Sequence, residues 1–147
     1  MQWETISASE SETIDSGQKL AGFLNKGDIV ALSGQVGSGK TIFVKGVCKA
    51  FAISPAVVHS PTFLIMNLYE GKFRDEQLAV RHFDFYRLER EEDLRELGVD
   101  EWLDDRESIK LIEWSEHIHS HLVGRHWFVR LEVLEDVIRR IEIEFKD

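Results

Sequence analysis

One short stretch constrains the fold of this chain more than any other. Residues 34–41 read G-Q-V-G-S-G-K-T and match the pattern G-x-x-x-x-G-K-[ST] at every fixed position. An apolar run of β-rich composition at 28–33 precedes this glycine loop, and a stretch with helical apolar spacing at 40–51 follows it. Strand, glycine loop and helix therefore come in the order in which this pattern binds phosphate groups.

The chemistry of the loop predicts a bound nucleoside triphosphate. Glycines let consecutive backbone N–H groups turn toward phosphate oxygens, and the N-terminus of the helix adds partial positive charge. Lys40 is expected to reach the β- and γ-phosphates, and Thr41 to supply a hydroxyl ligand for Mg²⁺. The alternative is a chance match in a glycine-rich turn, and the correct flanking elements argue against it.

Length and composition limit the remaining choices. A chain of 147 residues with 43% hydrophobic content fits one domain, 1–147, with one sizeable core. The formal net charge is −9, which repels a polyanion and disfavours nucleic-acid binding by this chain alone. The sequence shows no cationic leader followed by an apolar segment, and no apolar run near the roughly 18 residues that cross a bilayer, so we expect a cytoplasmic protein without a membrane contact.

The pattern of apolar residues predicts an α/β fold in which helices flank a mixed sheet. Predicted strands lie at 2–6, 28–33, 62–69, 78–84, 108–114, 127–134 and 137–145. Predicted helices lie at 9–25, 40–51, 88–97 and 99–103. Residues 70–75 are expected to form the turn of a hairpin. The last two strands alternate apolar and charged residues, which indicates antiparallel strands at the C-terminal end of the chain.

Two acidic residues stand at the carboxyl ends of predicted strands, where a carboxylate of the Walker-B type lies in such folds. They are Asp84 and Glu113. Either one is a candidate for holding Mg²⁺ or orienting water, and the alternative for each is a solvated acid at a strand end. His82 precedes Asp84 by two residues, so both side chains share one face of the strand. A hydrogen bond from His82 that orients Asp84 is expected, with a packing role as the alternative.

Two further sets of polar residues admit more than one interpretation. His117, His119 and His121 suggest a metal cluster, but no cysteine or matching acid stands nearby, which favours a connector at the surface. Arg87 is a candidate to steady a phosphate or a carboxylate of a partner, and the alternative is a salt bridge with the acidic residues that follow it.

Several short motifs accompany the glycine loop in a fixed order. They are S-x-x-E-T at 9–13, S-P-T-F at 60–63, H-F-D-F-Y-R-L at 82–88, the segment 92–98, I-E-W at 112–114 and R-I-E-I at 140–143. Together, over nearly the whole chain, they resemble the TsaE family, small bacterial ATPases of tRNA threonylcarbamoyladenosine synthesis. The resemblance implies a P-loop NTPase-like fold whose sheet ends in antiparallel strands, which agrees with the prediction from the residues alone.

The resemblance also implies roles for single residues. The phosphate cradle would consist of Gln35, Val36, Gly37, Ser38, Gly39, Lys40 and Thr41. Thr41 and Glu113 would be the Mg²⁺ ligands, and Asp84 the Walker-B-like acid. Thr62 would be a switch-like catalytic residue beside Lys40, Asp84 and Glu113. Glu10 and Thr13 would lie near the base and ribose, with Trp114 as the aromatic residue beside the site. Gln35 replaces an acidic residue common in the family, which removes no phosphate contact.

The function implied by the resemblance is a weak ATPase that uses ATP and Mg²⁺ and acts with the proteins TsaB and TsaD. It would support repeated turnover of tRNA modification without transferring the threonylcarbamoyl group itself, and it would contact tRNA only indirectly. The alternative is a small P-loop kinase of a metabolite or nucleoside, although no segment is free to close over an acceptor. A nucleotide-controlled binding module with negligible turnover is a variant of the first reading.

Overall fold

The computed structural model describes residues 1–61, 65–88, 90–116, 118, 122 and 124–147. The strands are β1 (Gln2–Ser7), β2 (Ile29–Ser33), β3 (Met66–Phe73), β4 (Glu76–Asp84), β5 (Ser108–Glu113), β6 (His126–Glu135) and β7 (Ile138–Lys146). The helices are α1 (Glu10–Ala21), α2 (Lys40–Ala50), α3 (Glu91–Leu97) and α4 (Val99–Leu103), with a short 3₁₀ helix η1 (Pro55–Val57). None of the helices in the described part of the chain has the length and apolar content needed to span a bilayer.

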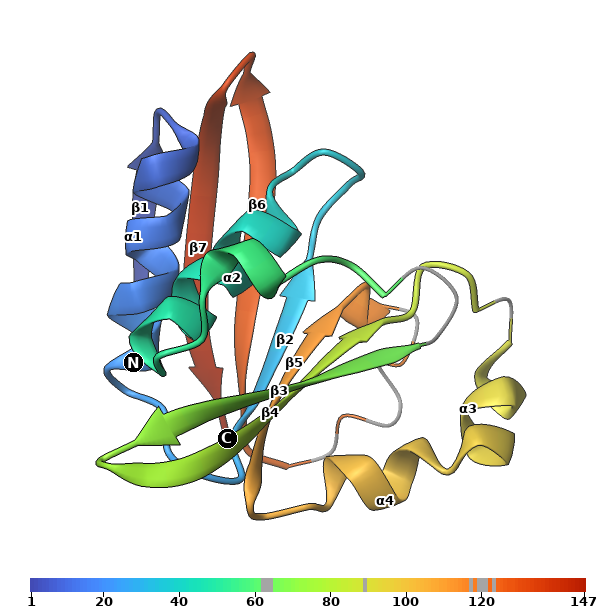
Figure 1. Cartoon of the computed structure of the whole chain (residues 1–147). Helices are drawn as coiled ribbons and strands as arrows, with labels where there is room; N and C mark the ends of the chain where they lie inside the picture. Colours follow the sequence, from blue (N-terminus) through green and yellow to red (C-terminus); the bar gives the residue numbers. More distant parts are fainter. Residues whose placement is uncertain (62–64, 89, 117, 119–121, 123) are drawn as a thin grey trace.

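The strands form one 7-stranded sheet in the order β1-β7-β6-β2-β5-β4-β3 (Figure 1). Its centre is parallel, because β2 pairs in parallel with β5 and β6, and β4 pairs in parallel with β5. Its two sides are antiparallel, with β7 between β1 and β6 on one side and the β3–β4 hairpin on the other. The predicted α/β fold with a mixed sheet and antiparallel C-terminal strands is confirmed.

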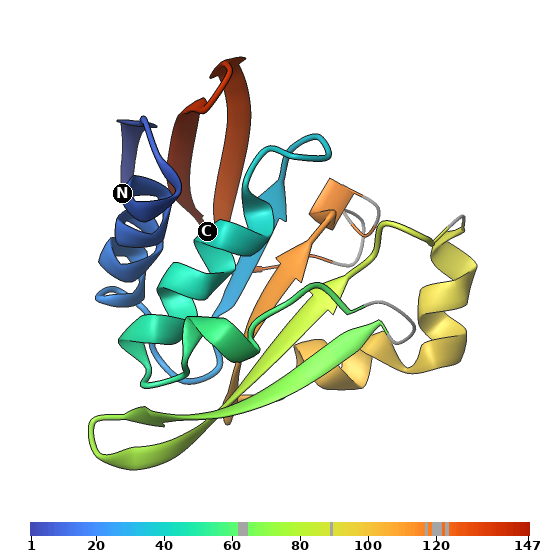
Figure 2. The same cartoon turned by 45° about the horizontal axis from the view of Figure 1, so that its top comes forward.

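Helices pack on both faces of the sheet (Figures 1 and 2). Strand β5 shows the division, because successive side chains of a strand point to opposite faces. Ile109 and Leu111 belong to the apolar cluster that includes buried residues of α1 and α2. Ile112 belongs to the second cluster, with buried residues of α3 and α4. The central strands are therefore covered on both faces, and polar groups at their carboxyl ends meet at one edge of the sheet.

Helix α1 begins where the sequence predicts and ends earlier. Ser9 is its N-cap, and its hydroxyl oxygen accepts a hydrogen bond from the N–H of Glu12 at 3.1 Å. The helix ends at Ala21 rather than near Asn25, because the next residues make tighter turns and the N–H of Asn25 bonds to the carboxylate of Asp28 at 2.8 Å. The predicted boundary was wrong by one turn, since an Asp side chain competes there with the helix.

The β3–β4 hairpin is longer than predicted and its turn is shorter. Residues 70–73 belong to β3 rather than to a loop, and the chain reverses at Arg74 and Asp75, whose φ angles are 50° and 68°. Gly71 misled the prediction. A Cβ atom at this position would lie 2.4 Å from the carbonyl oxygen of Phe51, so the glycine permits a close approach inside a strand. Residues 62–64, the start of the predicted strand, lie outside the described residues.

Two glycines let α1 and α2 approach closely and set the first turn of α1 beside the glycine loop. A Cβ atom at Gly17 would lie 2.3 Å from the carbonyl oxygen of Phe43, and one at Gly46 would lie 2.1 Å from the carbonyl oxygen of Ile14. Such contacts force two backbones apart, because neither position meets the flexible end of a side chain. The position of α1 over the loop therefore depends on these two residues.

Gly46→Ala is expected to lower the free energy of unfolding by about 1–3 kcal/mol, because the added methyl group clashes with the backbone of α1. Urea denaturation measures this difference. Gly22→Ala is the matched control, since the nearest atom to its Cβ would be 3.4 Å away and its φ of −63° suits alanine. Equal stability of the Gly46→Ala variant and the parent would show that α1 and α2 are not packed this closely.

Candidate functional site

The glycine loop joins β2 to α2 and presents hydrogen-bond donors to one point. Gly37 and Gly39 have φ angles of 79° and 103°, which other residues rarely adopt. The loop leads into the first turn of α2, whose N–H groups have no acceptor within the helix. Within the described part of the chain, the buried hydroxyl of Ser38 has no hydrogen-bond partner. These donors and the curled backbone fit an anion such as a phosphate group.

Lys40 is the first residue of α2, and the residue is 5% exposed. Its Nζ atom donates to the carbonyl oxygens of Gly34 and, at 3.1 Å, of Gln35, and lies 3.9 Å from the centre of the Trp114 ring. Burial lowers the pKa of Lys40, and the carboxylates of the strand-end acids oppose this shift. The cation therefore lies between the loop and the strand ends.

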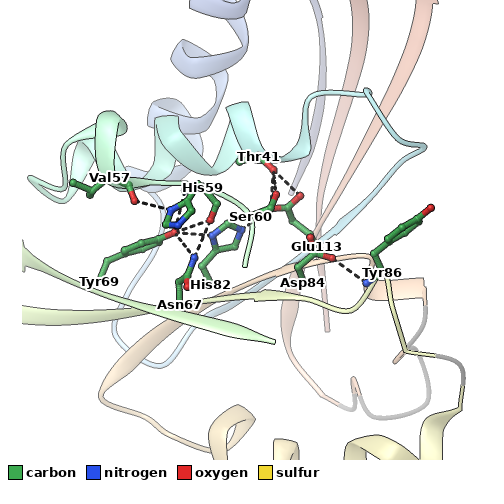
Figure 3. Close-up of polar contacts among 10 residues, drawn as sticks. All are labelled: Thr41, Val57, His59, Ser60, Asn67, Tyr69, His82, Asp84, Tyr86 and Glu113. Atoms are coloured by element: carbon green, nitrogen blue, oxygen red, sulfur yellow. Dashed lines mark hydrogen bonds and ion pairs between the residues drawn. The ribbon is translucent and has the colours of Figure 1, made fainter. Parts of the chain in front are cut away.

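Glu113, at the end of β5, contacts the first turn of α2. Its side chain is 3% exposed, and its two carboxylate oxygens lie 2.9 and 3.0 Å from Oγ1 of Thr41 (Figure 3). The same Thr41 oxygen lies 2.8 Å from the hydroxyl of Ser60. Hydroxyl and carboxylate oxygens are the ligands that Mg²⁺ prefers, so this group fits such an ion.

Asp84, at the end of β4, is the register partner of Glu113 in the parallel pair of β4 and β5. Both carboxylates therefore lie at the same edge of the sheet. Asp84 accepts a hydrogen bond from the N–H of Tyr86 at 2.9 Å. Burial raises the pKa of Asp84, and the nearby Glu113 carboxylate acts in the same direction, while the N–H of Tyr86 opposes it.

The predicted hydrogen bond between His82 and Asp84 is not formed. His82 bonds instead to Glu113 on the neighbouring strand. Its Nε2 atom lies 2.5 Å from Oε2 of Glu113, and its Nδ1 atom lies 3.0 Å from the hydroxyl of Tyr69 (Figure 3). The shared face was predicted correctly, but the partner depends on register. His82 is paired with Leu111, which places Glu113 diagonally opposite on the same face.

One cavity of about 790 Å³ brings most of the predicted site residues together. Its lining includes Glu10, Thr13, Val36, Gly37, Ser38, Gly39, Lys40, Thr41, Asp84, Glu113 and Trp114. Gln35 faces a neighbouring cavity of about 400 Å³ instead, and Arg87 lines neither. Thr62 lies outside the described residues, as do His117, His119 and His121.

Sequence reasoning missed several residues of this cavity. Arg139, on β7, donates from Nη2 to the carbonyl oxygen of Gly37 at 3.1 Å. Tyr86, which also lines the cavity, packs against Trp114 with ring centres 4.9 Å apart. The spacing of Tyr86, two residues after a strand-end acid, was an available signal for that residue. No local signal indicated Arg139, because its approach depends on β6 and β7 lying beside β2.

The mixed sheet and the glycine loop between β2 and α2 define a P-loop NTPase-like α/β protein. The crystal structure of YdiB from Bacillus subtilis is similar, with a TM-score of 0.75 and 26% sequence identity over 97% of this chain and 84% of that one. The sequence model of the family described as "Threonylcarbamoyl adenosine biosynthesis protein TsaE" matches residues 7–141.

Curated relatives agree with the family match. The protein named tRNA threonylcarbamoyladenosine biosynthesis protein TsaE is 37% identical in Rickettsia felis, over 87% of this chain and 71% of that protein. Its namesakes in Bacillus subtilis and Treponema pallidum are 34% and 33% identical, over 83% and 94% of this chain and 71% and 97% of those proteins. The chain belongs to the TsaE family of threonylcarbamoyl adenosine biosynthesis proteins, and the predicted family is confirmed.

The raised pKa of Asp84 predicts that Asp84→Asn stabilises the fold at neutral pH. Relative to the unfolded chain, a carboxyl with a raised pKa favours folding below its unfolded-state pKa and loses that contribution as the pH rises through its folded-state pKa. Asparagine carries no charge and still accepts the N–H of Tyr86. Urea denaturation in magnesium-free buffer should show a more stable variant at pH 7, and the gain should vanish below about pH 4.

Asp15→Asn, on the exposed side of α1, is the control for this measurement and should change stability little at any pH. A loss of stability in Asp84→Asn at pH 7 would contradict the description of Asp84 as a carboxylate whose burial disfavours its charge.

Proposed function

We propose that this chain binds Mg²⁺-ATP and hydrolyses it slowly, in support of TsaB and TsaD during formation of threonylcarbamoyladenosine in tRNA. Membership of the TsaE family supports the pathway. One observation carries the nucleotide part of the proposal. The donors of the glycine loop and the oxygens of Thr41 and Glu113 line a single cavity, and the Thr41 hydroxyl joins the two sets.

The phosphates would occupy the curled loop, held by its N–H groups, the Ser38 hydroxyl and Lys40. To reach them, Lys40 exchanges the loop carbonyls that its ammonium group contacts for phosphate oxygens. Thr41 and Glu113 would hold Mg²⁺, which neutralises charge on the β- and γ-phosphates when bound. Asp84 accepts the proton of a water molecule or orients it, and burial, which raises its pKa, suits a group that exchanges protons.

The first turn of α1 and the β6–β7 turn border the other end of the cavity. Glu10 and Thr13 line it from α1, and Val137 lines it from the hairpin. We assign the ribose and the base to this end, with the preference for adenine resting on the family. Residues 25–28 read Asn-Lys-Gly-Asp, a pattern that reads guanine in some P-loop proteins, but here they lie between α1 and β2, ahead of the glycine loop, and none of them lines the cavity.

The charge of the chain supports proteins rather than nucleic acid as its direct partners. With a formal net charge of −9, the chain gains little from counterion release on tRNA, so its contact with tRNA would be indirect, through TsaB and TsaD. A cytoplasmic location is part of the same proposal.

Lys40→Ala is expected to weaken Mg²⁺-ATP binding by about a hundredfold, or ~2.7 kcal/mol, because it removes a buried cation from the phosphate site. Isothermal titration calorimetry measures the affinity. Lys49→Ala removes an exposed cation from the same helix and should bind as the parent does. Unchanged affinity in a folded Lys40→Ala protein would contradict phosphate binding by the glycine loop.

The biological role is tested by reconstituting threonylcarbamoyladenosine formation on tRNA with TsaB and TsaD over repeated cycles. Modification should continue past the first cycle only with the parent chain, and its ATP turnover should rise when the partners are added. The Lys40→Ala variant should behave like omission of the chain. If synthesis proceeds equally with the parent chain, with Lys40→Ala and without the chain, and the chain alone phosphorylates a small metabolite, a P-loop kinase is the better description.

A further inference from the structure

A series of polar contacts runs from the site into the interior of the protein. From Glu113 it passes to His82, whose side chain is 0% exposed, and then to the hydroxyl of Tyr69. The Tyr69 hydroxyl lies 3.2 Å from the carbonyl oxygen of His59. The next residue, Ser60, returns to Thr41 at 2.8 Å, and Thr41 contacts Glu113 (Figure 3).

The partners of a neutral His82 ring determine which of its two nitrogens carries the proton. An ionised carboxylate only accepts hydrogen bonds, so Nε2 of His82 carries the proton that it shares with Glu113. In the neutral ring Nδ1 is then an acceptor, and the one hydrogen of the Tyr69 hydroxyl goes to it at 3.0 Å instead of to the carbonyl oxygen of His59 at 3.2 Å. The hydroxyl of Tyr69 thus selects the tautomer that serves Glu113, as an outer partner does for a histidine beside a metal site.

These contacts also determine how Glu113 orients its carboxylate oxygens. Nε2 of the buried His82 contacts Oε2 of Glu113, so the carboxylate cannot turn away from Thr41 without breaking this 2.5 Å contact in the interior. We infer that His82, backed by the Tyr69 hydroxyl, is the positioning residue that sets Glu113 for Mg²⁺. This inference rests on the proposed function, because it assigns a task within the same Mg²⁺-nucleotide site.

Variants that keep one of the two hydrogen bonds of His82 distinguish a role in positioning Glu113 from a role in stability alone. In His82→Gln the side-chain amide nitrogen reaches about as far as Nε2 and retains the bond to Glu113. In His82→Asn the shorter amide retains only the bond to Tyr69. Tyr69→Phe keeps the packing of the aromatic side chain at position 69 and removes its hydroxyl. Val129→Ala is the control for lost stability, since it removes buried methyl groups from β6, a strand that contributes none of the contacts of His82 and Glu113.

The measured quantity is the Mg²⁺ concentration that gives half-maximal binding of a fluorescent ATP analogue. In His82→Asn it should rise about tenfold or more, as for other partners of metal ligands. It should rise less in Tyr69→Phe, and it should stay within about threefold of the parent in His82→Gln. Val129→Ala should leave it unchanged although the protein unfolds at lower urea. Equal values in His82→Asn and the parent, or equal increases in His82→Asn and Val129→Ala, would overturn the inference.

A second measurement is independent of nucleotide. In the ligand-free protein, nitrogen-15 NMR should find the His82 proton on Nε2, and Tyr69→Phe should weaken that preference. A proton found on Nδ1 alone would overturn the inference whatever the nucleotide does. If the parent itself fails to bind the ATP analogue with Mg²⁺ while the NMR result holds, the proposed function fails and the contact of His82 with Glu113 stands.

Discussion

The contact between Thr41 and Glu113 joins the two halves of the candidate site. Thr41 belongs to the first turn of the helix that follows the glycine loop, and Glu113 ends a central strand of the sheet. A distance of 2.9 Å between their side-chain oxygens fixes how the loop donors and the strand-end carboxylates face each other. The parallel pairing of β2 with β5 makes this possible, because it brings the end of β5 beside the start of the loop.

A buried carboxylate in this position is costly unless polar groups surround it. Glu113 is 2% exposed and meets such groups on two sides, the hydroxyl of Thr41 and the imidazole of His82. The ammonium group of Lys40 adds a favourable charge, since the Glu113 carboxylate acts to raise the pKa that burial lowers. The site therefore holds opposite charges in a small volume, which suits a ligand that carries both phosphates and a metal ion.

The parts of this arrangement that depend on local sequence were predictable, and those that depend on strand order and register were not. The glycine loop, its flanking elements and the two strand-end acids follow from spacing and from residue type. The partner of His82 required the register of β4 against β5, which no spacing within one strand reveals. The sequence predicts a turn residue at Gly71. A glycine is needed there because the strand passes close to the backbone of Phe51, a contact that local sequence does not reveal. Arg139 reaches the loop only through the order of β7, β6 and β2.

A crystal structure of the protein with Mg²⁺ and a non-hydrolysable ATP analogue tests the central claim most directly. The phosphates should lie in the glycine loop with Lys40 turned toward them. The metal ion should be bound about 2.1 Å from Thr41 Oγ1 and from a carboxylate oxygen of Glu113. A metal ion bound elsewhere, with the contact between Thr41 and Glu113 intact beside the phosphates, would contradict the account.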